Sequence, residues 1–211
     1  MDPFAHLMSG DLVALDAALA ADPKLAGASN ADGASLLSFA HYMGNAKAAE
    51  IIRKHKPKLT PYETLIAGGD VGDHIAAGWD PNARSPDGFT PLALACFFKN
   101  SIAFDRLLPL TKDVNARATN VQQVAALHSA VAVRDNAAVE KLLRAGADPN
   151  LPQQQGFRPL HTTAQHGDAV GTGLLLLFGA DRKLVTDGGE TPGETARKSG
   201  HDWLAERLSA R

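Results

Sequence analysis

Residues 80–95 read DPNARSPDGFTPLALA, and parts of this stretch return along the 211-residue chain at intervals of 33 to 35 residues. Its first three residues recur unchanged as Asp148-Pro149-Asn150, with one substitution as Asp113-Val114-Asn115, and with two substitutions as Asp181-Arg182-Lys183. Leu92 inside it is followed by Leu127 and Leu160, 35 and 33 residues further on. Such a period is typical of stacked supersecondary units, each of which buries its apolar face only against its neighbours.

The same stretch predicts a turn followed by a helix. Gly88 suits a turn that requires a positive backbone φ. Thr90 is placed to cap a helix whose first residue is Pro91, where a missing amide hydrogen costs nothing. Leu92 and Ala95 then fall on one helix face, and the small alanine lets an adjacent helix approach closely.

A second helix in each unit is indicated by paired leucines. They are Leu107-Leu108, Leu142-Leu143 and Leu175-Leu176. In two units the run closes with Gly146-Ala147-Asp148 or Gly179-Ala180-Asp181, where glycine is suited to the left-handed conformation that ends helices.

Together these residues resemble the ankyrin repeat, whose mark is an Asp-x-Asn-Ala run, a Gly-x-Thr-Pro-Leu-His run, two antiparallel helices and a Gly-Ala-Asp close. The resemblance implies an all-α ankyrin-repeat solenoid, and it implies protein binding through a concave face lined by turn tips and first helices. The Ala- and Gly-rich composition favours a small bacterial protein of this type. We therefore expect a protein–protein interaction module or adaptor, not an enzyme.

The predicted single domain spans 1–211 in six to seven helix-turn-helix units. These are 4–27 (an N-terminal cap), 28–60, 61–82 (short), 83–115, 116–150, 151–183 and 184–211 (a C-terminal cap). The short unit has no recognisable turn ahead of it. Either it leaves a notch in the row of turn tips between Ala34 and Phe89, or it only changes the local curvature of the stack.

Composition bounds the class of protein. Apolar residues make up 45% of the chain and aromatic residues 6%, which suits a solenoid of Ala and Leu helices. A net charge of −2 gives no global attraction to nucleic acid or an anionic membrane. The chain has no run of 18 apolar residues and no basic segment ahead of an apolar start, so neither a membrane span nor a secretory signal is expected. The single cysteine, Cys96, favours a reducing, cytoplasmic setting, and we expect a monomer.

Carried over by register, the resemblance implies a partner surface in the middle units. Its residues are Tyr42, Met43, Phe89, Phe97, Phe98, Val133, Gln154, Gln155, Phe157 and His166. Tip Glu190 and helix position Lys198 extend it as a polar end. Aromatic side chains ringed by polar groups are typical of binding hot spots. The alternative is that Phe97 and Phe98 pack sideways onto adjacent helices and stabilise the stack.

Residue patterns for catalysis, metals and phosphate are weak. The resemblance gives His128 and His161 a structural role, as hydrogen-bond partners of turn backbone in neighbouring units. His161 and His166 are five apart, so they point in different directions from a helix and cannot chelate one metal ion. Cys96 lies at an Ala-type helix position, which favours packing. Arg53-Lys54-His55-Lys56 has no interleaved aromatic residues and is interpreted as a solvated helix end.

Other functions remain as alternatives to an adaptor. They are a secreted effector that docks a host protein, a hydrolase or metal-binding protein that uses Cys96 or the histidines, and a nucleic-acid binder. No cofactor or metal is expected.

Overall fold

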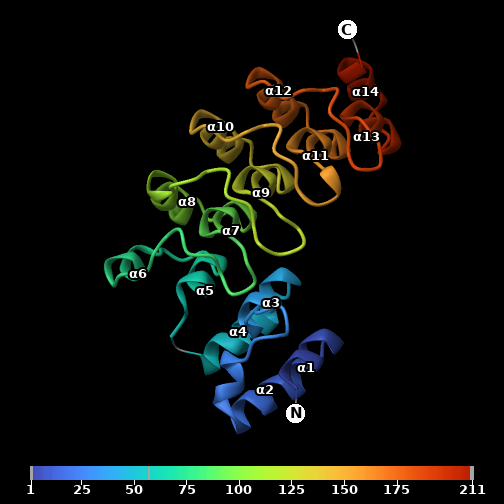
Figure 1. Cartoon of the computed structure of the whole chain (residues 1–211). Helices are drawn as coiled ribbons and strands as arrows, with labels where there is room; N and C mark the ends of the chain where they lie inside the picture. Colours follow the sequence, from blue (N-terminus) through green and yellow to red (C-terminus); the bar gives the residue numbers. More distant parts are fainter. Residues whose placement is uncertain (1, 57, 210–211) are drawn as a thin grey trace.

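The computed structural model describes residues 2–56 and 58–209, which form a stack of paired antiparallel helices (Figure 1). The first helices are α1 (Pro3–Ser9), α3 (Leu36–Tyr42), α5 (Pro61–Ile66), α7 (Pro91–Phe97), α9 (Ala126–Ala132), α11 (Pro159–His166) and α13 (Pro192–Lys198). The second helices are α2 (Leu12–Ala21), α4 (Ala46–His55), α6 (Gly72–Ala76), α8 (Ser101–Leu107), α10 (Asn136–Arg144), α12 (Ala169–Leu177) and α14 (Asp202–Ser209). Short 3-10 helices are η1 (Pro23–Gly27), η2 (Leu108–Leu110) and η3 (Gln154–Gly156).

The predicted all-α solenoid is confirmed. Among the described residues there is no β-strand, and the only β-pairing is an isolated bridge between Ser29 and Ser35. Loops project to one side of the stack as turns, and the second helices lie on the opposite side (Figure 1). We call the first helices together with these turn tips the inner surface, and the row of second helices the outer layer.

Capping explains where the helices begin. Thr90 accepts a hydrogen bond from the amide of Ala93, and Pro91 occupies the first turn of α7, as predicted. Each second helix from α8 to α12 begins with an Asn or Asp cap, namely Asn100, Asp135 and Asp168. These caps satisfy amide groups that the helix itself leaves without a partner.

The recurring Asp-x-Asn phrase links one unit to the next. Asn82, for example, accepts a hydrogen bond from the amide of Lys112 through Oδ1 and donates through Nδ2 to the carbonyl of Leu110. Asn115 and Asn150 make the same pair of bonds with the following unit. Lys183 occupies this position in the last of these phrases. The period in the sequence therefore reflects a polar ladder between units.

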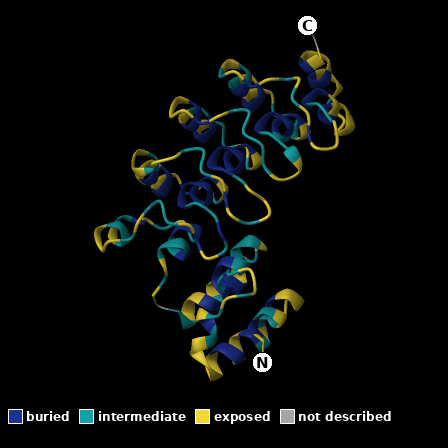
Figure 2. Cartoon of the chain, in the orientation of Figure 1, coloured by how far each residue is buried: buried dark blue, intermediate teal, exposed yellow. Residues whose placement is uncertain are grey.

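Two hydrophobic cores lie along the stack. Figure 2 shows that the buried residues lie mainly on the helices inside the stack and the exposed residues mainly at the turns and outer ends. One core belongs to α1–α4 and runs from Leu7 to Ile52, and the other runs from Leu65 in α5 to Leu208 in α14. The break between them falls between Ile52 in α4 and Leu65 in α5, so the short predicted unit, 61–82, belongs to the second core.

The notch considered for this unit is not formed. A Cβ on Gly33 would lie 2.6 Å from the carbonyl oxygen of Pro86, so the turn of one unit contacts the turn two units on. Ala34, expected at a tip, is instead buried, with 5% of its surface exposed. Gly33 has a φ of 88°, so glycine is required here both by conformation and by close approach. The row of tips is continuous because the two flanking turns close over the short unit.

Candidate interaction surface

An aromatic cluster occupies the inner surface where the two cores meet. It joins the end of α3 to the turn before α7 and to the end of α7. The ring centroid of Tyr42 lies 5.6 Å from that of Phe98 and 6.2 Å from that of Phe89. The ring centroids of Phe97 and Phe98 are 5.2 Å apart. The ring of His41 also meets the edge of Phe98, at 6.2 Å. These separations are typical of favourable aromatic pairs.

A polar anchor fixes the cluster. The hydroxyl of Tyr42 donates a hydrogen bond of 2.7 Å to Oδ2 of Asp87, and the hydroxyl of Ser85 donates one of 2.5 Å to the other carboxylate oxygen. Burial and the neighbouring Asp87 carboxylate raise the pKa of Tyr42, so the phenol stays protonated and remains a donor. The turn tip at Asp87 is therefore held against the helix end at Tyr42.

Exposure divides the cluster into supporting and accessible side chains. Tyr42, Phe89 and Phe98 are half-buried and pack against the second core. Phe97 keeps 45% of its surface exposed, and Met43, which follows Tyr42, keeps 47%. Sideways packing, considered for both phenylalanines, thus describes Phe98 better than Phe97.

Backbone hydrogen bonds tie successive turn tips into one row. The amide of Thr119 donates to the carbonyl of Gly88, that of Gln154 to Gln122, and that of Asp187 to Gln155. Gln154 and Gln155 are exposed at their tip, and the neighbouring tip exposes Val121 and Gln122. The turn tips from Gly88 to Asp187 therefore form one connected row, which is mostly polar but includes the exposed Val121.

The remaining predicted positions lie further along the stack and apart from the aromatic cluster. Val133 follows the end of α9 and is half-buried. Phe157 packs on His161 at 5.6 Å, so it contacts its own unit. His166 ends α11, where its carbonyl accepts a hydrogen bond of 2.8 Å from the guanidinium of Arg134. Of the ten predicted residues, four contact one another through their rings and form the aromatic cluster: Tyr42, Phe89, Phe97 and Phe98.

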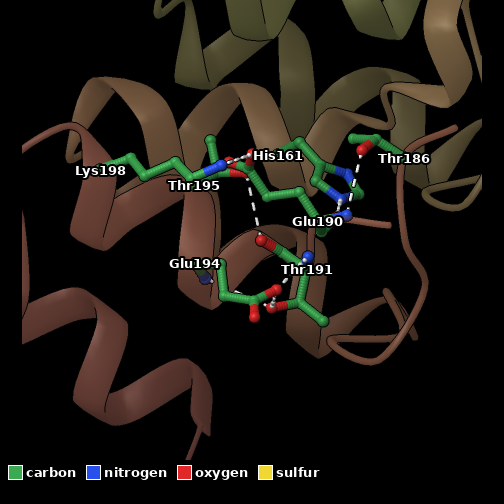
Figure 3. Close-up of polar contacts among 7 residues, drawn as sticks. All are labelled: His161, Thr186, Glu190, Thr191, Glu194, Thr195 and Lys198. Carbon is green, nitrogen blue, oxygen red and sulfur yellow. Dashed lines mark hydrogen bonds and ion pairs between the residues drawn. The ribbon is translucent and has the colours of Figure 1, made fainter. Parts of the chain in front are cut away.

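At the C-terminal end of the inner surface, the tip pairs with the helix (Figure 3). The ammonium group of Lys198 lies 2.5 Å from a carboxylate oxygen of Glu190. Next to it, Thr191 and Glu194 form a reciprocal cap at the start of α13. The carbonyl of Glu190 is hydrogen-bonded to Nε2 of His161, at 3.0 Å. This end of the surface is polar, as predicted, and its charges largely satisfy each other.

Sequence reasoning missed two basic residues, Lys99 and Arg134, which directly follow Phe98 and Val133. The turn after each first helix from α3 on contains a residue with positive φ: Gly44, Gly68, Lys99, Arg134, Gly167 and Gly200. Lys99 and Arg134 occupy this position with φ of 51° and 54°. A left-handed backbone costs a non-glycine residue roughly 1–2 kcal/mol. The guanidinium of Arg134 recovers part of this cost by donating a hydrogen bond to the carbonyl of His166, whereas Lys99 has no side-chain hydrogen bond or ion pair within the described residues.

Replacing Lys99 with glycine should raise the free energy of unfolding by about 0.5–1 kcal/mol, because relief of the left-handed strain exceeds the added entropy of the unfolded chain. Urea denaturation would measure it. Lys47, inside α4, provides the control: Lys47→Gly should lower stability by up to about 1 kcal/mol. A loss of stability in Lys99→Gly as large as the control's would contradict the assignment of strain.

The residues considered for catalysis or metal binding have structural roles: Cys96 is buried, and His128 and His161 hydrogen-bond to backbone carbonyls. Cys96 is buried in α7, where burial, with a smaller contribution from Asp135, raises the pKa of its thiol and disfavours the thiolate nucleophile. A small cavity of about 90 Å³ lies beside it. His128 and His161 bond to the carbonyls of Leu151 and Glu190, which confirms their expected structural role. Within residues 2–56 and 58–209, no three side chains of the metal-binding types are grouped as a site. In the same residues, no helix has the length and apolar character to cross a membrane.

Comparison with known proteins gives matches to parts of much longer chains. The chain is 34% identical to the ARF GTPase-activating protein GIT2 of Mus musculus over 108 residues, which are 51% of this chain and 15% of that protein. It is 35% identical to the ARF GTPase-activating protein GIT1 of Homo sapiens over 108 residues, 51% and 14% of the two chains. It is 32% identical to SH3 and multiple ankyrin repeat domains protein 1 of Homo sapiens over 147 residues, 68% and 7% of the two chains. No family model matches the chain.

These matches cover only a small part of each relative, so the GTPase-activating activity named for two of them is not carried over to this chain. The third match extends over most of this chain and is to a protein named for its ankyrin repeats. Together with the stack of helix pairs and the polar ladder between units, it supports ankyrin-like repeats as the architecture of this chain.

Proposed function

We propose that this chain is a protein-interaction module, or adaptor, that binds a protein partner through its concave face, the inner surface defined above. The observation that supports this most is Phe97, a phenylalanine with 45% of its surface exposed, supported by the rings of Phe98 and Tyr42. Similarity to a protein with multiple ankyrin repeat domains agrees with such a role. We also propose the division into units at 4–27, 28–60, 61–82, 83–115, 116–150, 151–183 and 184–211, each of which contains one helix pair.

Preorganisation favours a hot spot at this position. An exposed aromatic side chain that is already held in place loses little conformational entropy when a partner covers it. Tyr42 is fixed by Asp87, and Phe98 packs between Tyr42 and Phe97. Met43 adds a flexible apolar contact next to the rings, which suits an irregular partner surface. The tips that carry Gln122, Gln154 and Gln155 supply a polar rim.

Replacing Phe97 with alanine should weaken partner binding by about 2 kcal/mol, or roughly 30-fold, because the side chain is the accessible part of the cluster. Thermal unfolding should change little, since half of the ring is already in water. The partner would first be captured from source cells through a photoreactive amino acid placed at Phe97, and its affinity for the purified wild type and variant then compared.

Two controls separate binding from stability. Ile102→Ala removes an apolar side chain of the outer layer that is 57% exposed, and should leave binding unchanged. A photoreactive residue at Arg144, on the outer face of α10, should not capture the same protein. If Phe97→Ala retained full affinity, or if Arg144 captured the partner as well as Phe97 did, the inner surface would not be the binding site.

A further inference from the structure

The outer layer shows how one second helix packs on the next. From its cap, Asn100, α8 presents Ser101, Phe104 and Asp105 toward α10. Lys141 of α10 lies 5.6 Å above the Phe104 ring and 2.6 Å from a carboxylate oxygen of Asp105. Positions one, four and five after the cap are therefore the positions of α8 that receive the following outer helix.

The corresponding face of α4 has no such helix. Counted from its cap, Asn45, the same positions are Ala46, Ala49 and Glu50. They line a groove of about 450 Å³, together with His41 and, one turn further along α4, Arg53 and Lys54. The next second helix, α6, has only five residues and stands away from α4 in Figure 1. The separation of the two hydrophobic cores falls at the same place.

Three polar side chains of this groove lack an interaction partner within the described residues: Arg53, Lys54 and His41, the last at its Nε2 atom. Arg53 and Lys54 are exposed and make no ion pair within the described residues, whereas the next two basic residues, His55 and Lys56, are paired with Asp16 and Glu63. Nε2 of His41 is buried and has no hydrogen-bond partner there. A buried polar atom without a partner is costly, and a ligand that supplied one would be stabilised.

We propose that this groove is a second docking site, centred on α4 and adjoining the inner surface only at His41, that receives one α-helix of a partner protein bearing acidic side chains opposite Arg53 and Lys54. Ala46 and Ala49 form a floor of small residues, so the incoming helix can lie close to α4. Glu50 occupies the position of Asp105 and takes a basic residue of the incoming helix, as Asp105 takes Lys141. The recognised feature is thus a basic residue followed, about one turn later, by acidic ones.

The test uses a display library of 16-residue peptides with an Ala-rich helical framework and one randomised face. Selection on the full chain, with counter-selection on the double variant Arg53→Glu/Lys54→Glu, should enrich peptides with Asp or Glu on that face. The double variant should bind an enriched peptide at least tenfold more weakly, and replacing the acidic residues of the peptide with lysine should restore binding to it. Amide chemical shifts should change mainly at residue 41 and residues 46–54.

Further variants make the outcome decisive. Ala46→Gln adds bulk to the floor without changing charge and should also weaken binding, and thermal unfolding would confirm that each variant is folded. Phe97→Ala should bind the peptide with unchanged affinity, so a failure of the inner surface as a binding site would not affect this result. The proposal would be overturned by an absence of enrichment, by enriched peptides without acidic residues, or by shifts centred on the inner surface. Equal binding of a single-stranded oligonucleotide, or concentration-dependent self-association that involves the same amides, would overturn it as well.

Discussion

Replacing Glu63 with alanine is expected to lower the free energy of unfolding by about 3 kcal/mol, because it leaves the ammonium group of Lys56 without its partner in a largely buried site. Only 1% of the Glu63 surface is exposed. Its carboxylate lies 2.6 Å from Nζ of Lys56, and it accepts hydrogen bonds of 2.7 Å from the hydroxyl of Ser35 and 2.9 Å from the amide of Thr60. Burial alone would raise the pKa of Glu63, but these three donors outweigh it and hold the pKa below its ordinary value.

The position of Glu63 adds a second expected effect. Ser35 and Lys56 belong to the block of α1–α4, which has its own core, whereas Glu63 begins the block that follows. Loss of the carboxylate should therefore uncouple the two cores, so that amide hydrogens of α1–α4 exchange faster than those of α7–α12. Hydrogen exchange and urea denaturation would measure both effects.

An exposed pair provides the matched control. Glu140 and Arg144 lie four residues apart on α10 and are largely in water, so Glu140→Ala should cost less than about 0.5 kcal/mol. If Glu63→Ala cost no more than this, or if all helices exchanged together in a single step, Glu63 would not join the two blocks.

Local chemistry explains how much of the fold the sequence predicts. The turn at Gly88, the cap at Thr90 and the helix end at Gly146 each depend on residues within a few positions, so their patterns are visible without a structure. His128 and His161 follow the same register and occupy the predicted positions. The repeat period predicted a stack of units, each packed only against its neighbours, and the resemblance to the ankyrin repeat predicted that the units are helical.

What the sequence does not predict depends on contacts between distant residues. Tyr42 and Asp87 are 45 residues apart, and the turns at Gly33 and Pro86 meet across the short unit that separates them in the sequence. Register placed Phe97 and Phe98 together at a helix end, but their different exposure depends on Tyr42, which comes from another unit. The strained Lys99 had a signal in the sequence, since glycine stands at the equivalent position as Gly44, Gly167 and Gly200.

Acidification should destabilise the stack well above the range where carboxylates titrate, and His128 explains why. Nδ1 of His128 accepts a hydrogen bond of 3.0 Å from the amide of Ala125, so the proton is on Nε2, which lies 2.9 Å from the carbonyl of Leu151. A second proton on Nδ1 would face that amide hydrogen. Burial lowers the pKa of His128 to about 4. The hydrogen bond to the carbonyl of Leu151 opposes this shift, and the nearby charge of Arg117 adds to it. The neutral imidazole is therefore the form that the fold requires.

Below pH 6.5 the unfolded chain binds a proton at His128 that the folded chain does not, so stability falls as the pH decreases from about 6.5 to about 4. The loss from this residue should reach about 2 kcal/mol at pH 5, at 1.36 kcal/mol per pH unit. Burial also lowers the pKa of His161, which adds a loss of the same sign. Urea denaturation at pH 7, 6 and 5 would measure the slope, and His128→Gln should reduce it. Ala130→Gly, which destabilises α9 without touching an imidazole, should keep the full slope. A wild-type stability that stayed constant between pH 7 and pH 5 would show that His128 accepts its second proton in the folded chain.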